Sequence, residues 1–317
     1  LLGALGSAQS PFMGPLNSTP DYLFAGQAGQ TASDGVTLPN TLDGDSAFMF
    51  DAKRDGSFHA AITPGTSTVI VPGATTPSVP AMGQPNRALT TSAITVAEGT
   101  NFNKNPATGL AYTYSVSFSN VTLDPATNTL SATYNVSSTD PAFVPPAAQT
   151  LNPIKIGEKG EFNINGLPPG MSMKVTTLPT KAVDGTITPS PANGDTIKIS
   201  PQASVFSVID KAIAEIKAAP NSNVAAQAIS QALANVDIGL ERMSNIRSYA
   251  GELLNRADRI TGDQEKRSVQ LESDRSRAED LDMIKGISDF QNQQTGYQAA
   301  LQTYASVQKL SLFNYIS

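Results

Sequence analysis

Hydrophobic positions divide the chain into two halves of different character. Up to about residue 200, short runs alternate between apolar and polar residues and are separated by turn-forming residues, which is the pattern of β-strands. From about residue 203, apolar residues recur every three or four positions, which is the spacing of amphipathic helices. The sequence therefore predicts an α+β multidomain protein with a β-rich half and a long antiparallel α-helical rod.

The first half contains seven runs that we expect to be strands. Between two of them lies "LDPATNTL", which predicts a hairpin connection with Pro125 and Asn128 as turn residues. Proline-rich stretches such as "TPSVPAMGQP" predict loops or sheet edges, because proline lacks the N–H that a central strand needs. The runs are "FHAAI", "STVIV", "YTYSVSF", "LSATYNV", "FNING", "MKV" and "TIKI".

The second half predicts three helices. The first is "SVFSVIDKAIAEIKAA", and "APNSN" ends it. The second runs from about Val224 to Ile260. A break is expected at "TGDQ", where Gly262 ends that helix and Asp263 caps the third, which runs to about Leu310. The second helix has a coiled-coil-like apolar seam, interrupted by Arg247: Ile229, Leu233, Val236, Leu240, Met243, Ala250, Leu254 and Ala257.

The third helix begins polar and becomes apolar. "QEKRSVQLESDRSRAEDLD" is typical of a solvated helix face, and the three-four spacing resumes at Ile284. Gln294 lies on the resumed seam, where polar residues favour register and partner choice. A helix of about 48 residues is about 70 Å long, more than one small β domain can bury. We therefore expect further helices, from an N-terminal segment or from neighbouring molecules.

The chain ends on "LSLFNYIS", although free termini usually carry polar residues. An apolar terminus of this kind is typical of an interface that is completed on assembly. The alternative interpretation for Phe290, Tyr297, Leu301 and Tyr304 is a core within the helical domain. The predicted assembly interface consists of Phe290, Tyr297, Leu301, Tyr304, Leu310, Leu312, Phe313, Tyr315 and Ile316.

Composition excludes several classes of protein. A net charge of -6 argues against a nucleic-acid binder, which needs a basic face for phosphates. The sequence contains no run of 18 apolar residues, so we expect no membrane span, and no ordinary secretory signal is visible. Cysteine is absent and His59 is the single histidine. Disulfides, thiolate zinc sites and a cysteine nucleophile are thereby excluded, and a serine–histidine triad is disfavoured.

No motif in the β-rich half predicts catalysis. His59 lies in an alternating run and is expected on a strand face. "GEKGEFNING" lacks the lysine and the helix start of a phosphate loop. Asp43 and Asp45 lie in an acidic turn, but the twelve-residue calcium loop with its terminal glutamate is missing. We expect no catalytic, cofactor-binding or metal site, and an enzyme or adhesin in this half remains the less favoured alternative.

Several stretches resemble the flagellin superfamily. "LERMSNIRSYAGELLNRADRI" and the residues that follow it to the end are similar to the C-terminal segment of that superfamily. The ending "KLSLFNYIS" of this segment resembles the hook-associated protein 3 family, the proteins that join the flagellar hook to the filament, and so does "DYLFAGQAGQT" at residues 21–31. This family begins with N-terminal helices, so we expect residues before Asp21 to be a remnant of that segment in a fragment or a late-numbered chain.

The resemblance implies a structural subunit of the bacterial flagellum that is not an enzyme and needs no cofactor. The implied partners are further copies of the chain in a ring, the first hook–filament junction protein, flagellin and a flagellar export chaperone. The resemblance implies no binding to nucleic acid or membrane. The location would be extracellular, after secretion through the flagellar type III apparatus. A flagellin-type filament subunit is the alternative. The expected domains are 1–30, a remnant helical segment and crossover, 31–200, the outer β-rich domain, and 201–317, the helical rod with a terminal assembly helix at about 305–317.

Overall fold

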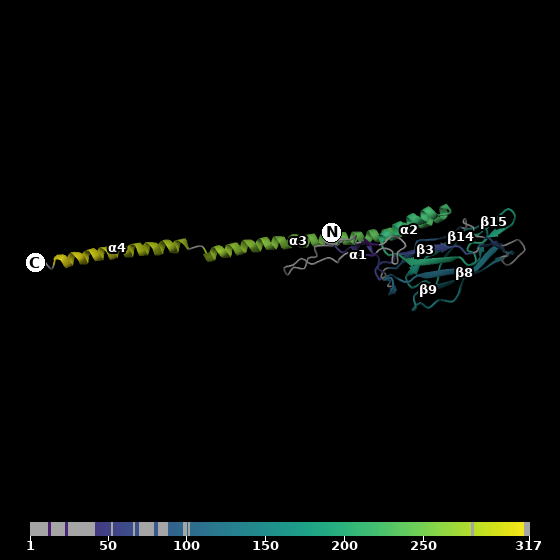
Figure 1. Ribbon diagram of the computed structural model, residues 1–317, viewed down its shortest axis with the longest axis horizontal. Helices are drawn as coiled ribbons and strands as arrows, with labels where there is room; N and C mark the ends of the chain where they lie inside the picture. The colour runs from purple at the N-terminus through teal and green to yellow at the C-terminus, as the bar shows by residue number, and fades with distance from the viewer. Residues whose placement is uncertain are drawn as a thin grey trace. The chain divides into compact units, whose positions relative to one another are not determined.

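The computed structural model describes residues 12–13, 23–24, 42–51, 53–65, 67–69, 79–81, 88–97, 100, 102–279 and 282–313. The chain divides into two compact units, residues 1–253 and residues 254–317. The first unit combines the strands with helices, and the second is helical where it is described (Figure 1). The α+β class, with a long helix and a β-rich region, is therefore as predicted.

Short strands dominate the first unit, and the longest helix begins there. The helices are α1 (Gly44–Phe48), α2 (Val205–Ala218), α3 (Ser222–Glu279) and α4 (Met283–Phe313). The strands are β1 (Phe12–Met13), β2 (Leu23–Phe24), β3 (Phe58–Thr63), β4 (Ser67–Val69), β5 (Val79–Ala81), β6 (Ala88–Thr91), β7 (Thr95–Val96), β8 (Tyr114–Asp124), β9 (Thr129–Ser138), β10 (Gln149–Thr150), β11 (Ile154–Lys155), β12 (Gly160–Asn163), β13 (Met171–Ser172), β14 (Lys174–Leu178), β15 (Thr180–Lys181), β16 (Ile187–Thr188) and β17 (Thr196–Pro201).

The main sheet grows from the hairpin of β8 and β9. Its order is β10-β9-β8-β17-β3, and β11 also pairs with β9. Alternate residues of β8 and β9 are buried, as their apolar–polar alternation predicts. Residues 125–128 connect the two strands, and Asn128 has a positive φ of 54°, a conformation that asparagine tolerates. The predicted hairpin is thus confirmed.

Most of the other predicted strands are also present. "FHAAI" lies in β3, "TIKI" in β17, and "FNING" and "MKV" overlap β12 and β14. "STVIV" begins with β4, and its last two residues lie outside the described residues. One edge of the main sheet is β3, and one edge of the three-stranded sheet β12-β14-β6 is β6.

The two sheets share one hydrophobic core. Phe118 of β8 is almost fully buried, with its ring centroid 6.0 Å from that of Tyr134 and 6.3 Å from that of Phe162. The Tyr134 hydroxyl accepts a hydrogen bond from the backbone N–H of Asn165 at 2.9 Å. The buried hydroxyl therefore has a partner, as a polar group in a core requires.

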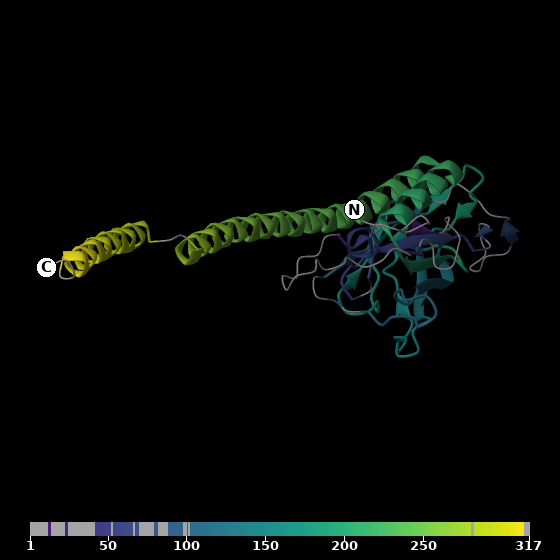
Figure 2. The same cartoon turned by 60° about the vertical axis from the view of Figure 1, so that its left-hand side comes forward.

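Helices α2 and α3 form an antiparallel hairpin beside the main sheet (Figure 2). Ser204 caps α2 through a reciprocal pair of hydrogen bonds with Ser207, a capping box. Three residues separate the end of α2 from the start of α3. Val205 at the beginning of α2 lies against Gly239, where an added Cβ would come within 2.7 Å of the valine Cγ2. Glycine at 239 thus permits close packing of the two helices.

The predicted break at residues 261–264 is wrong, because α3 continues to Glu279. A single glycine costs a helix only about 1 kcal/mol relative to alanine, so Gly262 does not end it. The Thr261 hydroxyl donates to the Ala257 carbonyl at 3.0 Å, as a helical threonine does. The polar stretch assigned to a third helix therefore belongs to α3 as far as Glu279, and the next helix starts at Met283.

We predict that Phe118→Ala lowers the free energy of unfolding of the first unit by about 3–5 kcal/mol, because it removes a buried ring from a packed core. Denaturant unfolding followed by circular dichroism measures this change. The matched control is Val183→Ala at a fully exposed position, which should change the value by less than about 0.5 kcal/mol. Similar losses in the two variants would contradict the assigned core.

Candidate assembly surface

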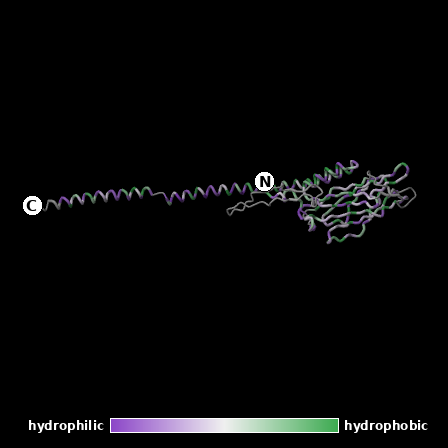
Figure 3. Tube along the Cα trace, viewed as in Figure 1, coloured by the Kyte–Doolittle hydropathy of each residue, from purple (hydrophilic) through white to green (hydrophobic). Residues whose placement is uncertain are grey.

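Hydrophobic positions recur along α4 (Figure 3). Large apolar and aromatic side chains of this helix are exposed to solvent. The exposed fraction is 66% for Phe290, 68% for Tyr297, 51% for Leu301 and 64% for Tyr304. These residues follow the predicted three-four spacing. Large apolar side chains exposed in a continuous series mark an interaction surface. Further exposed apolar side chains of α4 are Met283, Ile284, Ile287 and Val307.

The remaining predicted interface residues are described only in part. Leu310, Leu312 and Phe313 belong to α4, but their side chains are outside the described part of the structure. Tyr315 and Ile316 lie outside the described residues altogether. The assignment of all nine residues to an assembly interface stays a prediction.

The whole circumference of α4 lacks charge over residues 290–308. Two-stranded coiled coils usually carry charged residues beside their apolar seam. The preceding part of α3 differs, because Arg275 and Glu272 pair there at 2.6 Å and other exposed ion pairs follow the helix. An uncharged helix with an exposed aromatic series is suited to contacts on more than one side.

A second apolar surface covers the outside of the α2–α3 hairpin. We call it the outer stripe. Its α3 members continue the predicted coiled-coil seam, so three-four spacing was the signal in the sequence. That spacing did not reveal that these residues are exposed. The outer stripe consists of Ile209, Ile213, Ile216, Ile229, Leu233, Leu240 and Met243.

Another side of α3 faces the sheet edges with polar side chains. Gln231 is almost fully buried, and its amide accepts from the N–H of Ala60 at 3.0 Å and donates to the carbonyl of the same residue at 3.1 Å. It also donates to the Thr91 hydroxyl at 2.9 Å. Gln227 accepts from the N–H of Thr91 at 3.0 Å and donates to the Ala60 carbonyl at 3.3 Å. Two glutamines thus bind the backbone of both β3 and β6.

Asn235 continues this series one turn further. Its side chain donates to the carbonyl of Phe58 at 3.0 Å and accepts from the hydroxyl of Ser57 at 2.7 Å. Backbone groups at the open edge of β3 are thereby hydrogen-bonded although no further strand adds to that edge among the described residues. We call Gln227, Gln231 and Asn235 the amide face of α3.

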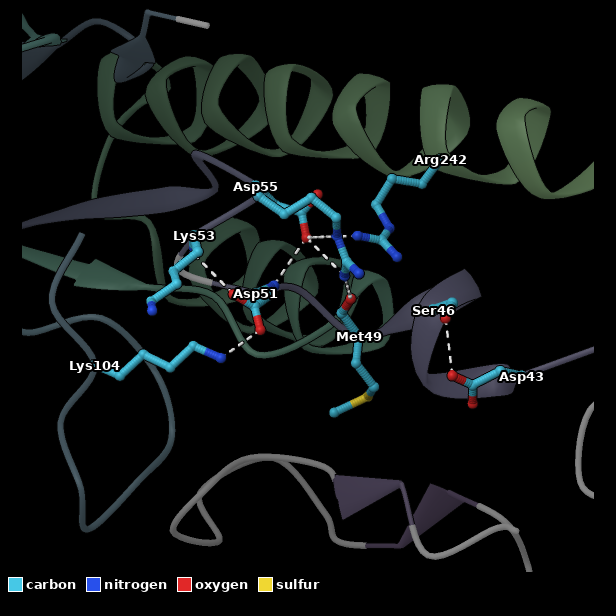
Figure 4. Close-up of polar contacts among 9 residues, drawn as sticks. Asp43, Ser46, Met49, Asp51, Lys53, Asp55, Lys104 and Arg242 are labelled. Carbon is cyan, nitrogen blue, oxygen red and sulfur yellow. Dashed lines mark hydrogen bonds and ion pairs between the residues drawn. The ribbon is translucent and has the colours of Figure 1, made fainter. Parts of the chain in front are cut away.

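A buried ion pair completes the contact (Figure 4). Arg242 of α3 binds Asp55 through Nη1 and Oδ2 at 2.5 Å, and both side chains are about nine-tenths or more buried. Arg54 binds the same carboxylate oxygen through Nε at 3.0 Å. The backbone N–H of Asp51 donates to it as well, at 2.8 Å. The charge of Asp55 is therefore well compensated, as a buried carboxylate requires.

The neighbouring acidic residues have structural partners. Asp51 binds Lys104 at 2.5 Å and accepts from the N–H of Lys53 at 2.8 Å. Burial acts to raise the pKa of Asp51, and the hydrogen bonds from Lys104 and Lys53 act to lower it. The hydrogen bonds outweigh burial, so the pKa lies below its usual value of 3.8. Asp43 caps α1 by accepting from the N–H of Asp45 and from the hydroxyl of Ser46.

The groups considered for chemistry are placed as follows. His59 lies on β3 as predicted, and its Nε2 is 2.5 Å from a carboxylate oxygen of Glu215 on α2. Burial and the nearby Asp43 raise the pKa of Asp45.

Among the described residues, no group of three or more acidic, histidine or cysteine side chains could hold a metal ion. Within the same residues, no helix has the length and apolarity that crossing a membrane demands.

We predict that Arg242→Met lowers the free energy of unfolding by about 2 kcal/mol, because the buried Asp55 carboxylate keeps Arg54 but loses its second cation. Urea denaturation measures the change. Arg275→Met, which removes an exposed ion pair, is the control and should change the value by less than about 0.5 kcal/mol. Equal effects of the two substitutions would show that burial of the Asp55 pair is unimportant.

Stability should also depend on the Lys104–Asp51 pair in a pH-dependent way. The folded-state pKa of Asp51 is lowered, so its contribution is complete above pH 3.8 and is lost as the pH falls through the folded value. We predict that Lys104→Met is less stable than the unsubstituted chain at pH 7, and that the difference shrinks below pH 3.8. Thermal unfolding across this range, with exposed Lys285→Met as control, tests it. A difference that persists unchanged at low pH would contradict this assignment.

Comparisons with known proteins bear on the helical half. Residues 233–316 match the family model of the bacterial flagellin C-terminal helical region. A search of curated proteins found no match. Among solved structures, FlgL from Xanthomonas campestris has 18% identity and a TM-score of 0.46, over 82% of this chain and 69% of that chain. The flagellar junction protein FlgL from Legionella pneumophila has 20% identity and a TM-score of 0.47, over 83% and 70%.

At TM-scores this low the structural likeness carries no inference, and only the family match bears on function. That match begins at Leu233 in the outer stripe and ends at Ile316, after α4. The expected resemblance to the flagellin superfamily is confirmed for this segment. Residues 233–316 are therefore similar to the bacterial flagellin C-terminal helical region.

Proposed function

We propose that the chain is a structural subunit of the bacterial flagellum, which assembles through α4 and joins the hook to the filament. One observation carries this proposal. The segment that matches the flagellin C-terminal region is also the segment in which large apolar side chains stand exposed in three-four spacing. A helical region of this family with an uncovered apolar surface is suited to polymer contacts.

The occupant of the α4 surface is the same helix of neighbouring copies. A second copy brings an identical pattern, in which Phe290, Tyr297 and Leu301 interdigitate with their counterparts. Residues 290–308 carry no charge, so adjacent identical helices do not repel one another. Gln294 lies within the seam, and its amide needs a hydrogen-bonding partner when buried, which favours one register. The function is therefore mechanical, and burial of aromatic surface supplies the association energy.

A junction role is favoured over that of a filament subunit by the ending "KLSLFNYIS" and by "DYLFAGQAGQT", which resemble hook–filament junction proteins. The two roles differ in how far the protein polymerises. A junction protein adds a limited layer between the first junction protein and flagellin, whereas a flagellin extends long filaments. Incubation of the purified chain with filament seeds distinguishes them, and long growth would favour the flagellin alternative.

The proposal includes an extracellular location, reached by export through the flagellar type III apparatus. An export chaperone would cover the apolar terminus before export, because an uncovered aromatic series favours aggregation. The absence of cysteine is compatible with export of an unfolded chain, since no disulfide can form on the way. We propose no enzymatic activity and no cofactor. An adhesin role for the β-rich half is the second candidate, and no particular residue favours it.

We predict that Leu301→Asp prevents assembly while the chain remains folded, because a carboxylate at this position would be buried without a partner in the interface. The free chain should tolerate it, since Leu301 is half exposed and belongs to the second unit. Sedimentation with and without hook ends as nuclei measures assembly. Gln302→Asp, on the same exposed helix, adds the same charge one position away and serves as a comparison for charge alone.

Val183→Asp is the control on the β-rich unit, where the side chain is fully exposed, and it should assemble normally. If the Leu301→Asp variant assembled as well as this control, the α4 seam would not be the interface. If the Leu301→Asp and Val183→Asp variants both failed to assemble, the loss would reflect the added charge rather than the α4 surface.

A further inference from the structure

The α3 residues of the outer stripe and the amide face lie on different sides of the same helix. At about 100° per residue, their centres are nearly half a turn apart around α3. Burial against a sheet normally selects the apolar side of a helix. In α3 the polar side is buried instead. Gln231 and Asn235 are buried against the sheets, and Leu233 and Leu240 are exposed.

The reason lies in the two sheet edges beneath α3. The N–H and carbonyl of Ala60, the carbonyl of Phe58 and the N–H of Thr91 all bind amide side chains of α3. If the helix turned by nearly half a turn, apolar side chains would cover these groups and leave them without partners. An apolar side chain cannot replace the paired donor and acceptor of a glutamine amide.

We propose that the amide face, Gln227, Gln231 and Asn235, sets the rotational orientation of α3 and thereby leaves the α3 residues of the outer stripe exposed. These glutamines and the asparagine are positioning residues. They act on assembly only by deciding which side of α3 is presented. The use of the stripe rests on the proposed function, whereas the orientation is a property of the free chain and is tested without assembly.

Neighbouring features agree with this role. Gln227, Gln231 and Asn235 are spaced by four residues, so their amides lie along one side of the helix. Ala228, one position after Gln227, is small and buried as well. Arg242 extends the polar contact by pairing with Asp55. The polar contact therefore runs from Gln227 to Arg242.

The orientation can be read by thiol labelling, because the chain contains no cysteine of its own. Leu240→Cys reports the outer stripe and Ala228→Cys reports the buried side of α3, where Ala228 is 4% exposed. With the amide face intact, a maleimide should modify the Leu240→Cys thiol at least about tenfold faster than the Ala228→Cys thiol. In the Gln231→Met/Asn235→Leu background, we expect this order to reverse, because the apolar side then competes successfully for the sheets.

Substitutions of the same kind at exposed positions, Gln270→Met and Asn255→Leu, form the matched control background and should leave the order unchanged. Circular dichroism shows whether each background is folded. If the double variant does not fold, Gln231→Met alone is measured, and the ratio of the two labelling rates should fall at least about threefold. An unchanged ratio of the two labelling rates in a folded variant would overturn the proposal. Failure of the Gln231→Met variant to fold would overturn it as well, because the amides would then serve only to hold the sheet edges.

Discussion

The hydrogen-bonded contact between the side-chain amides of α3 and the open edges of β3 and β6 is the constraint on which the rest of the first unit depends. Gln231 binds both backbone groups of Ala60, and Asn235 binds the carbonyl of Phe58. The contact fastens a helix to two sheets at once and satisfies backbone groups that no further strand of the described residues reaches. It also explains why α3 follows the sheet edge with a polar side and keeps its apolar positions outside.

The outward apolar surfaces follow from this arrangement and from the composition of α4. The outer stripe stays exposed because the sheet side of α3 is already occupied. In α4 the aromatic series is exposed, and residues 290–308 are uncharged. A free helix of this length has little stability of its own in water, since most helical stability comes from packing. Contact with other copies would supply that packing, which links the exposure of these side chains to the proposed role.

Much of this organisation could be predicted from the sequence, and some could not. Alternation predicted β8, β9 and their turn because Asn128 and Pro125 mark the connection. Three-four spacing located α2 and the apolar series of α4, but it did not predict that a separate helix begins at Met283. Gly262 was misleading, because one glycine does not outweigh the hydrogen bonds of a long helix. The orientation of α3 was also beyond prediction, because Gln231 and Asn235 resemble ordinary surface residues until the partners on β3, distant in the sequence, are known.

Amide hydrogen exchange of α4 in the free chain and in the assembled state tests the central claim most directly. If α4 is an interface that is completed by neighbouring copies, the amides of residues 283–313 exchange fast in the free chain and become strongly protected on assembly. Protected amides in the free monomer, with no further protection after assembly, would contradict this account and would identify α4 as part of a core within one chain.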